Sequence, residues 1–398
     1  MNRRILISGA SIAGPTLAYW LARYGFTPTV VERAPRLREG GNGVDVRGQA
    51  VEVAERMGIM PRIRAAAADV TGLSFVDAAN RSVARIDMRA IQRRAASAEV
   101  EIMRGDLAAI LYEATRDVEY VFGDSIRAIE QDEDGVTVGF EHGPTRRFDL
   151  VIGADGTHST VRHLTFGPEA QFVKHLGYYF AFAEADPALG EQRWVTLYNR
   201  PGRAASIYRS GTHAGAKANF IFRSRPIPYD HRDVEQQKRL LSEAFAGLPW
   251  LVPDLLAGAL ADPDFYFDAL SQVRMASWSS GRVALAGDAA HCASPAAGAG
   301  ATLSLVGAYR LAGELSSAAG DHRIAFRRYE QGYRTTVERS QSNLFIGMIA
   351  PKSRRGIWAR NTMARLPLLA TMAGVERRLQ PRIRPLPDYG SATGSLRA

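Results

Sequence analysis

The sequence predicts an α/β protein in which an open parallel sheet is joined to a second, β-rich domain and a C-terminal helix. Three observations lead to this fold class. A buried strand at the start of the chain runs into a glycine-bearing turn and a helix, two later apolar runs also end on turns with glycine and aspartate, and residues 165–272 hold many aromatic and β-branched runs. At 398 residues the chain is long enough for two domains.

The first forty residues predict a strand, a tight turn and a helix. The apolar run of residues 3–8 leads into Gly9-Ala-Ser-Ile-Ala-Gly14, and a helical pattern follows. Gly9 lets the chain reverse, Gly14 lets the helix pack closely on the strand, and the first helical amides direct partial positive charge at a pyrophosphate. Ser11 replaces the middle glycine of a GxGxxG turn, and its hydroxyl can donate to a phosphate. An ordinary strand-helix turn without a ligand is the alternative.

The next apolar run ends on Glu32, 23 residues after Gly9, where the ribose-binding acid of a dinucleotide fold is expected. Its carboxylate would accept hydrogen bonds from the ribose hydroxyls. Residues 36–48 are rich in glycine and arginine and predict a loop that runs close to an anionic or planar ligand. Arg33 and Arg47 beside these glycines are candidate ligand contacts, with solvated surface charges as the alternative.

Two further turns are expected at the same edge of the sheet. Arg104 directly precedes a predicted helix, which suits a polar cofactor edge, although an ion pair with Asp106 would explain it equally well. The buried run 148–153 ends on Asp155-Gly156. Because ligands of open α/β sheets bind at the carboxyl ends of the strands, Asp155 is placed to meet the same ligand as Gly9.

The third buried run, residues 281–286, ends on Gly287-Asp288 and leads into a stretch of small residues before a long helix. Small side chains at this density allow a large flat ligand to lie against the backbone. A helix that begins near Gly300 would also present its amides to an electron-rich edge of that ligand.

The domain organisation follows from these patterns. Residues 1–70, 97–165 and 273–345 are expected to form the cofactor domain, residues 71–96 and 166–272 a substrate-binding sheet, and residues 346–398 a basic helical segment and tail. An apolar pocket is expected at the junction of the two domains. Arg47, Arg209 and His213 are the weak candidates for catalytic polar groups in it.

Charge and cysteine content limit the function classes. The net charge is +9, and residues 351–398 hold ten Lys or Arg against two acids, which fits either an anionic partner or a terminal amphipathic helix over residues 366–372. The helix is the preferred interpretation, with no nucleic-acid partner and no stable membrane insertion. The single cysteine, Cys292, excludes an internal disulfide, a cysteine zinc cluster and a redox-active cysteine pair. No metal site is expected, and the protein is expected to be cytoplasmic.

Taken together, the three turns resemble those of class A flavin-dependent monooxygenases. These are FAD-dependent aromatic and polyketide hydroxylases related to p-hydroxybenzoate hydroxylase and the tetracycline-modifying monooxygenases. The resemblance covers the full length and implies a Rossmann-like FAD-binding domain of the glutathione reductase-like, p-hydroxybenzoate hydroxylase fold. The cofactor-binding residues expected on these grounds are Gly9, Ser11, Ile12, Ala13, Gly14, Glu32, Arg33, Arg47, Arg104, Asp155, Asp288, Pro295, Gly298, Gly300, Ala301 and Thr302.

The resemblance also implies individual roles. Glu32 would hold the adenosine ribose, Arg104 the polar chain of FAD, and Asp288 the ribityl hydroxyls. Pro295, Gly300 and Ala301 would line the isoalloxazine. Asp155 would serve the motif that the family shares between FAD and NAD(P)H binding, and Arg47 would belong to the loop beside the mobile flavin. Thr302 departs from the asparagine that many relatives carry, as Ser11 departs from glycine.

The family mechanism is then expected. NADPH or NADH reduces the flavin, molecular oxygen forms a C4a-hydroperoxide, and its distal oxygen is transferred to an electron-rich carbon of an aromatic or polyketide-like small molecule. The cofactor carries the difficult chemistry while the protein positions the substrate. The alternatives are a non-catalytic FAD-binding or sensor protein, and a flavin oxidoreductase of another type.

Overall fold

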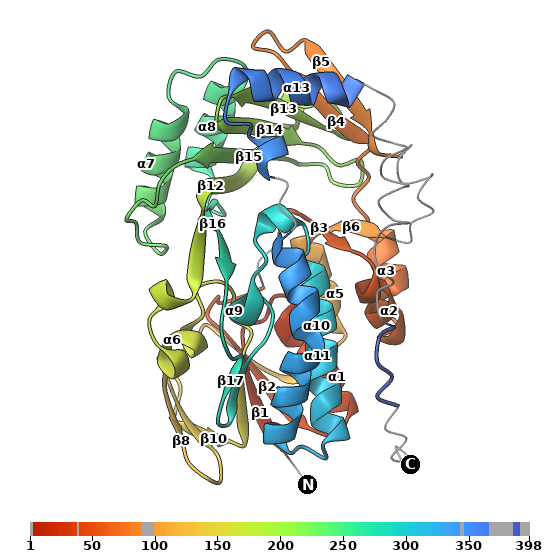
Figure 1. The fold of residues 1–398 in the computed structure, drawn as a ribbon, viewed down its shortest axis with the longest axis vertical. Helices are drawn as coiled ribbons and strands as arrows, with labels where there is room; N and C mark the ends of the chain where they lie inside the picture. Colours follow the sequence, from red (N-terminus) through yellow and green to blue (C-terminus); the bar gives the residue numbers. More distant parts are fainter. Residues whose placement is uncertain (1–2, 38–39, 90–98, 343–345, 366–384, 391–398) are drawn as a thin grey trace.

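The structure is a computed structural model that describes residues 3–37, 40–89, 99–342, 346–365 and 385–390. A six-stranded sheet forms the lower part of the molecule in Figure 1, in the order β17-β18-β11-β1-β2-β7. Its strands are parallel except β17, which pairs antiparallel with β18. Their bounds are β1 Arg4–Ser8, β2 Thr27–Glu32, β7 Glu119–Phe122, β11 Leu150–Gly153, β17 Ser279–Ser280 and β18 Val283–Leu285. The predicted open parallel sheet is confirmed.

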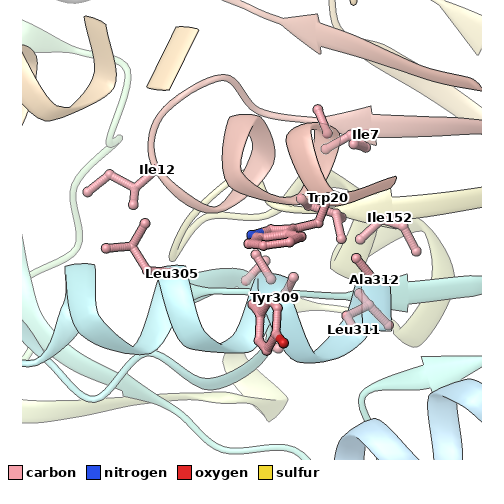
Figure 2. Packing of buried hydrophobic residues seen from close by; sticks show 14 of the residues in the cluster. Ile7, Ile12, Trp20, Ile152, Leu305, Tyr309, Leu311 and Ala312 are labelled. Carbon is pink, nitrogen blue, oxygen red and sulfur yellow. The ribbon is translucent and has the colours of Figure 1, made fainter. Parts of the chain in front are cut away.

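Helix α1 (Ala13–Arg23) and helix α10 (Gly300–Ser317) pack together beside this sheet, with α11 (His322–Ser342) outside α10. Their contact is centred on the rings of Trp20 and Tyr309, which meet edge to face with centroids 4.7 Å apart. Figure 2 shows both rings in the cluster that holds Ile7 and Ile152 of the central strands. Each large apolar side chain buried in this way contributes about 1.5–3 kcal/mol.

A seven-stranded sheet forms the upper part of the molecule, in the order β16-β12-β15-β14-β13-β4-β5. Neighbouring strands are antiparallel except β13 and β4, which are parallel. The bounds are β4 Gly72–Val76, β5 Ser82–Asp87, β12 Val173–Ala185, β13 Trp194–Arg200, β14 Arg203–Tyr208, β15 Ala216–Arg223 and β16 Tyr266–Val273. We propose that this sheet and the six-stranded sheet mark the two domains expected from the sequence.

The two faces of the seven-stranded sheet have different surroundings. Helices α7 (Val234–Phe245) and α8 (Val252–Ala261) cover one face, where Phe220 and Ile207 are fully buried. On the opposite face Phe75 and Phe180 pack with residues of α12 (Ile346–Ile349) and α13 (Arg354–Arg365). The helix expected over residues 366–372 lies outside the described residues, whereas α13 ends just before them.

Smaller elements complete the fold. A ribbon of β3 and β6 connects the two large sheets in Figure 1, and a three-stranded sheet of β8, β9 and β10 lies near α6. The bounds are β3 Gly43–Val46, β6 Val100–Met103, β8 Ile126–Gln131, β9 Val136–Phe140, β10 Arg146–Phe148, α2 Gln49–Arg56, α3 Met60–Ala65, α5 Arg104–Glu113, α6 Thr160–Phe166, α9 Asp288–His291, η1 Glu169–Gln171, η2 Pro187–Leu189 and η3 Pro295–Ala297. Residues 36–48 were expected to be a loop throughout, but residues 43–46 form β3 because they pair with β6, far along the chain.

Candidate functional site

The first turn can be built only with glycine at two positions. Gly9 has a φ of +106°, and a Cβ on Gly14 would lie 1.9 Å from the carbonyl oxygen of Gly9. The close approach of α1 to β1 therefore leaves the first amides of the helix open at the carboxyl edge of the sheet. Glu32 is bound to this turn, because its Oε2 accepts a hydrogen bond from Ala10 N at 2.8 Å. Its Oε1 accepts a second hydrogen bond, from Ala34 N, at 2.9 Å.

Arg104 reaches across to the same turn from the first position of α5. Its Nη2 and Nε donate to Ser11 Oγ at 2.9 and 3.2 Å. The alternative partner considered for Arg104, the carboxylate of Asp106, is instead bonded to His213 Nε2 at 2.8 Å. The serine that replaces the middle glycine thus anchors a guanidinium beside the turn.

Asp155 follows β11 and lies against Gly9. A Cβ on Gly9 would be 2.5 Å from the carbonyl oxygen of Ala154, so the two turns are in direct contact. The Asp155 carboxylate accepts hydrogen bonds from Ser159 Oγ at 2.5 Å and from Val161 N at 3.1 Å. Burial raises the pKa of Asp155. Ser8 Oγ, at the end of β1, also donates to Asp155 Oδ2 at 3.4 Å, so this carboxylate joins the start of α6 to the central strand.

Asp288 begins α9 at the end of β18, on the same edge of the sheet. Burial raises the pKa of its carboxyl, and the positive charge of Arg104 opposes that rise. The structure therefore brings Asp288 and Arg104, separated by 184 positions in the sequence, into one electrostatic environment. A half-buried carboxylate with a guanidinium in its electrostatic surroundings suits the recognition of a hydroxyl-bearing, anionic chain.

Arg47 is bound to the turn that precedes α10. Its Nη2 donates to the carbonyl oxygen of Ala297 at 3.1 Å, and its backbone N–H donates to Thr302 Oγ1 at 3.3 Å. Thr302 Oγ1 in turn donates to the carbonyl oxygen of Asp45 at 3.0 Å. Thr302, the departure from asparagine, thus holds the β3 strand end against the start of α10.

The remaining small residues of this turn adopt the open backbone expected of them. Pro295 begins the short helix η3, Gly298 follows it with a φ of +57°, and Gly300 begins α10. Ala296 packs against the face of the seven-stranded sheet that carries Phe180. The turn therefore lies between the two large sheets.

Three predicted residues are not part of this arrangement. Arg33 is exposed after β2. Arg209 donates through Nη1 to the carbonyl oxygen of Gly190 at 3.1 Å, within the loops of the seven-stranded sheet. His213 is held by Asp106 and lies beside α5. Among the described residues, the expected cofactor contacts that the structure brings together are Gly9, Ser11, Ile12, Ala13, Gly14, Glu32, Arg104, Asp155 and Asp288, with a second group formed by Arg47, Pro295, Gly298, Gly300, Ala301 and Thr302.

The sequence analysis missed a carboxylate pair on the β3–β6 ribbon. Asp45 and Glu101 lie directly opposite each other in the strand register, and Tyr208 of the seven-stranded sheet donates its hydroxyl to Glu101 Oε1 at 3.1 Å. Burial and the charge of Asp45 raise the pKa of Glu101 to about 7. The only sequence signal was an acid in a short apolar strand, which gives no indication of its partner.

A second missed network links the turn after β11 to the seven-stranded sheet. His158 contacts Glu169 through Nδ1 at 3.0 Å and Asp268 through Nε2 at 3.2 Å. Burial alone would lower the pKa of His158, but the hydrogen bonds to the two carboxylates raise it to about 10. Asp268 also accepts the hydroxyls of Tyr229 at 2.9 Å and Tyr266 at 3.1 Å. His158 therefore joins the turn after β11 to η1 and to β16.

The face of the seven-stranded sheet away from α7 and α8 carries a row of four side chains that lie side by side. Tyr266, Phe182, Asn219 and Ser206 are paired in register across four neighbouring strands. Along β15, half-buried Asn219 alternates with fully buried Phe220 on the helix-covered face. An amide and a hydroxyl, joined by a 3.3 Å hydrogen bond, thus lie beside aromatic rings on a partly accessible surface.

Residues 2–325 match the FAD binding domain family. The chain belongs to this family of flavoproteins. It is 42% identical over 341 residues to the uncharacterized protein Rv1260 of Mycobacterium tuberculosis, covering 85% of this chain and 92% of that protein. It is 39% identical over 340 residues to a flavin-dependent monooxygenase of Legionella longbeachae, covering 85% of this chain and 87% of the relative. These matches confirm the class A FAD-dependent monooxygenase family that the three turns predicted.

Solved structures agree with this family assignment. The tetracycline destructase Tet(51) matches with a TM-score of 0.84 and 34% identity, covering 98% of this chain and 100% of that structure. The structure of Klebsiella pneumoniae HpxO with FAD and uric acid matches with a TM-score of 0.71 at 22% identity, which shows the shared fold. The predicted fold of a flavoprotein monooxygenase is thereby confirmed.

The residues of this flavoprotein site fit FAD. The space that a Cβ on Gly14 would fill is occupied by the backbone of Gly9, so the helix start has the compactness that a pyrophosphate site requires. Arg104 supplies a cation beside it, and Glu32 supplies acceptor oxygens at the end of β2. Donors suited to phosphates and acceptors suited to hydroxyls thus lie around the same turn.

Proposed function

We propose that this FAD-dependent monooxygenase uses NADPH or NADH and molecular oxygen to hydroxylate an aromatic or polyketide-like small molecule. The observation that carries the proposal is the row of half-buried Tyr266, Phe182 and Asn219 with buried Ser206, which lies on the sheet face that also packs against Ala296 of the turn before α10. An apolar surface with a few polar groups at a domain junction is the usual form of a small-molecule site.

The cofactor, when bound, supplies the activation of oxygen that no amino-acid side chain provides. In our proposal Glu32 and Arg104 hold the nucleotide half of FAD, and Asp288 holds the polyol chain. The Arg47–Thr302 contact fixes the turn beside which the ring system would lie. Each of these groups binds or orients, and none has to change its covalent state.

The substrate class follows from the chemistry of the row. Phe182 and Tyr266 have stacked rings with centroids 6.2 Å apart, and these rings offer a surface for a planar substrate. The amide of Asn219 can both donate to and accept from phenol or enol oxygens. The cation nearest this row along β15, Lys217, is paired with Glu184, so its charge is already compensated. This arrangement favours a planar, oxygen-bearing molecule over a small carboxylic acid.

The test is a screen of phenols and polyketides for stimulated NADPH or NADH consumption, with mass spectrometry for the gain of one oxygen atom. The similarity to a tetracycline destructase makes tetracyclines the first polyketides to test. We expect at least one aromatic compound to accelerate consumption and to gain oxygen. A yellow protein that oxidises no reduced nicotinamide with any compound would favour the non-catalytic FAD-binding or sensor function.

Two substitutions at neighbouring positions separate substrate binding from the stability of the fold. Asn219→Leu changes the accessible sheet face, and Phe220→Leu is its control on the opposite, buried face. Loss of the polar group of Asn219 should raise the KM of the substrate while FAD stays bound, because Asn219 lies on the accessible face. Phe220→Leu should lower stability, since Phe220 is fully buried. An unchanged KM in Asn219→Leu would remove Asn219 from the proposed substrate site.

A further inference from the structure

The helix α13 is fixed to the seven-stranded sheet by its inner face. Arg360 lies over the ring of Phe75 with its guanidinium carbon 3.8 Å from the ring centroid. Its Nη1 donates to Asn199 Oδ1 at 2.7 Å and to the carbonyl oxygen of Met348 at 3.0 Å. Ala364, one turn later, is buried in the same contact. The orientation of the helix about its axis is therefore set.

This orientation turns large apolar side chains to the surface. Trp358 is 70% exposed on the side of α13 away from the sheet, and Met363, on a flank of the helix, is 50% exposed. Arg354 and Arg355 lie one turn before Trp358 and are exposed, whereas Arg365, two turns after it, donates through Nε to the carbonyl oxygen of Val83 at 2.7 Å. We call the residues Arg354, Arg355 and Trp358 the outer face of α13.

Tryptophan is enriched at interfaces because its ring is apolar while its N–H can still reach a polar partner, so the exposed ring of Trp358 is a candidate contact. The residues around it decide which partner it suits. The stretch 351–365 contains no Asp or Glu, and Lys352, Arg354 and Arg355 are exposed at its start. A second copy of this chain would present the same positive charge, so self-association through this face would be opposed by repulsion.

We propose that the outer face of α13 docks on the surface of an anionic phospholipid bilayer. Arginine guanidinium groups pair with lipid phosphates through parallel hydrogen bonds, and tryptophan favours the boundary between headgroups and acyl chains. A helix of 12 residues that lies flat can place both kinds of group at that depth at once. None of the described helices is long and apolar enough to cross a bilayer.

The test is co-sedimentation of the full-length, FAD-loaded protein with vesicles of phosphatidylcholine alone or phosphatidylcholine mixed with phosphatidylglycerol. We expect binding only to the anionic vesicles and its loss at high salt, because ions screen the attraction beyond a few ångströms. Reversing the charge of Arg354 and Arg355 to Glu should weaken binding by more than about tenfold. Trp358→Ala should weaken it several-fold, by loss of the inserted ring.

The matched control is the pair Arg327→Glu and Arg328→Glu, which changes the net charge equally on exposed positions of α11. Binding that survives in this control and fails in the α13 variants supports the proposal. Equal binding to both kinds of vesicle, equal loss in both double variants, or no vesicle binding at all overturns it. An oligomer that dissociates on Trp358→Ala without vesicle binding would show that a second copy covers this face. Unchanged flavin absorbance in every variant verifies folding.

Discussion

Arg104 and Ser11 are 93 positions apart in the chain, and two hydrogen bonds of 2.9 and 3.2 Å join the guanidinium of one to the hydroxyl of the other. The contact closes the start of α5 over the first turn of α1. A glycine at position 11 would leave this guanidinium without its partner. The departure from GxGxxG therefore has a structural function, which is to place a cation beside the first turn.

Replacing Arg104 with alanine is expected to weaken FAD binding. Hydrogen bonds to a charged group contribute about 1.5–3 kcal/mol, so the Kd for FAD should rise by about tenfold to a hundredfold. Titration of apoprotein with FAD, followed by flavin fluorescence, measures this. Arg62→Ala is the matched control, because Arg62 is exposed and pairs with Glu113 on the surface of α3 and α5. Equal FAD affinity in wild type and Arg104→Ala would remove Arg104 from the site.

Replacing Gly14 with alanine is expected to prevent a stable holoenzyme. The new Cβ would lie 1.9 Å from the carbonyl oxygen of Gly9, and neither backbone can shift without displacing α1 from β1. A cost of about 3 kcal/mol or more is expected. Thermal unfolding with and without added FAD measures it. Gly347→Ala serves as control, since a Cβ there meets nothing within 4 Å. Normal stability of Gly14→Ala would contradict the observed packing.

Replacing Asp288 with asparagine is expected to lose flavin without loss of fold. Burial raises the pKa of this carboxyl, which means that its ionised form is costly in the folded protein. The apo variant should therefore be at least as stable as wild-type apoprotein while FAD affinity falls. Absorbance near the flavin band and apoprotein melting are the two readouts. An Asp288→Asn protein that binds FAD as fully as wild type would contradict a role of Asp288 in FAD binding. Asp264→Asn is the control, because Asp264 is exposed and its replacement should change neither the flavin absorbance nor the melting temperature.

Glu101 should make stability fall as pH rises. Its pKa is raised to about 7 in the folded protein, by burial and by Asp45, from a reference value of 4.5. The folded state therefore binds more protons between these two pH values, and stability decreases across that window by at most about 3 kcal/mol. Urea unfolding of wild type and Glu101→Gln across this range measures the difference. The variant should lack this component of the pH dependence.

Tyr208→Phe provides a second check on the same carboxyl. The hydrogen bond from Tyr208 lowers the pKa of Glu101, so its removal should extend the fall in stability to higher pH. If the stability of wild type, Glu101→Gln and Tyr208→Phe changed with pH in the same way, the pKa of Glu101 would not be raised in the folded protein. The reason is that both substitutions act on one ionisable group and in opposite directions.

Local sequence determined the parts of the site that depend on neighbours along the chain. Gly9 and Gly14 encode their turn because only glycine fits its backbone, and Glu32 follows from the fixed length of a strand-helix-strand unit. The carboxyl ends of parallel strands meet at one edge, so the sequence alone places Asp155 and Asp288 at the same edge as the first turn.

Tertiary structure alone decided which groups face one another across strands. Whether Glu101 lies opposite Asp45 depends on the register of β6 against β3. A shift by one residue would turn the Glu101 side chain to the other face of this ribbon, away from Tyr208. The exposure of Trp358 likewise depends on how Arg360 anchors α13. The sequence thus determined this protein's cofactor turns, because backbone geometry is local. The pairing of its carboxylates and its outer helix face came only from packing, because contacts between distant segments are not encoded in any single stretch.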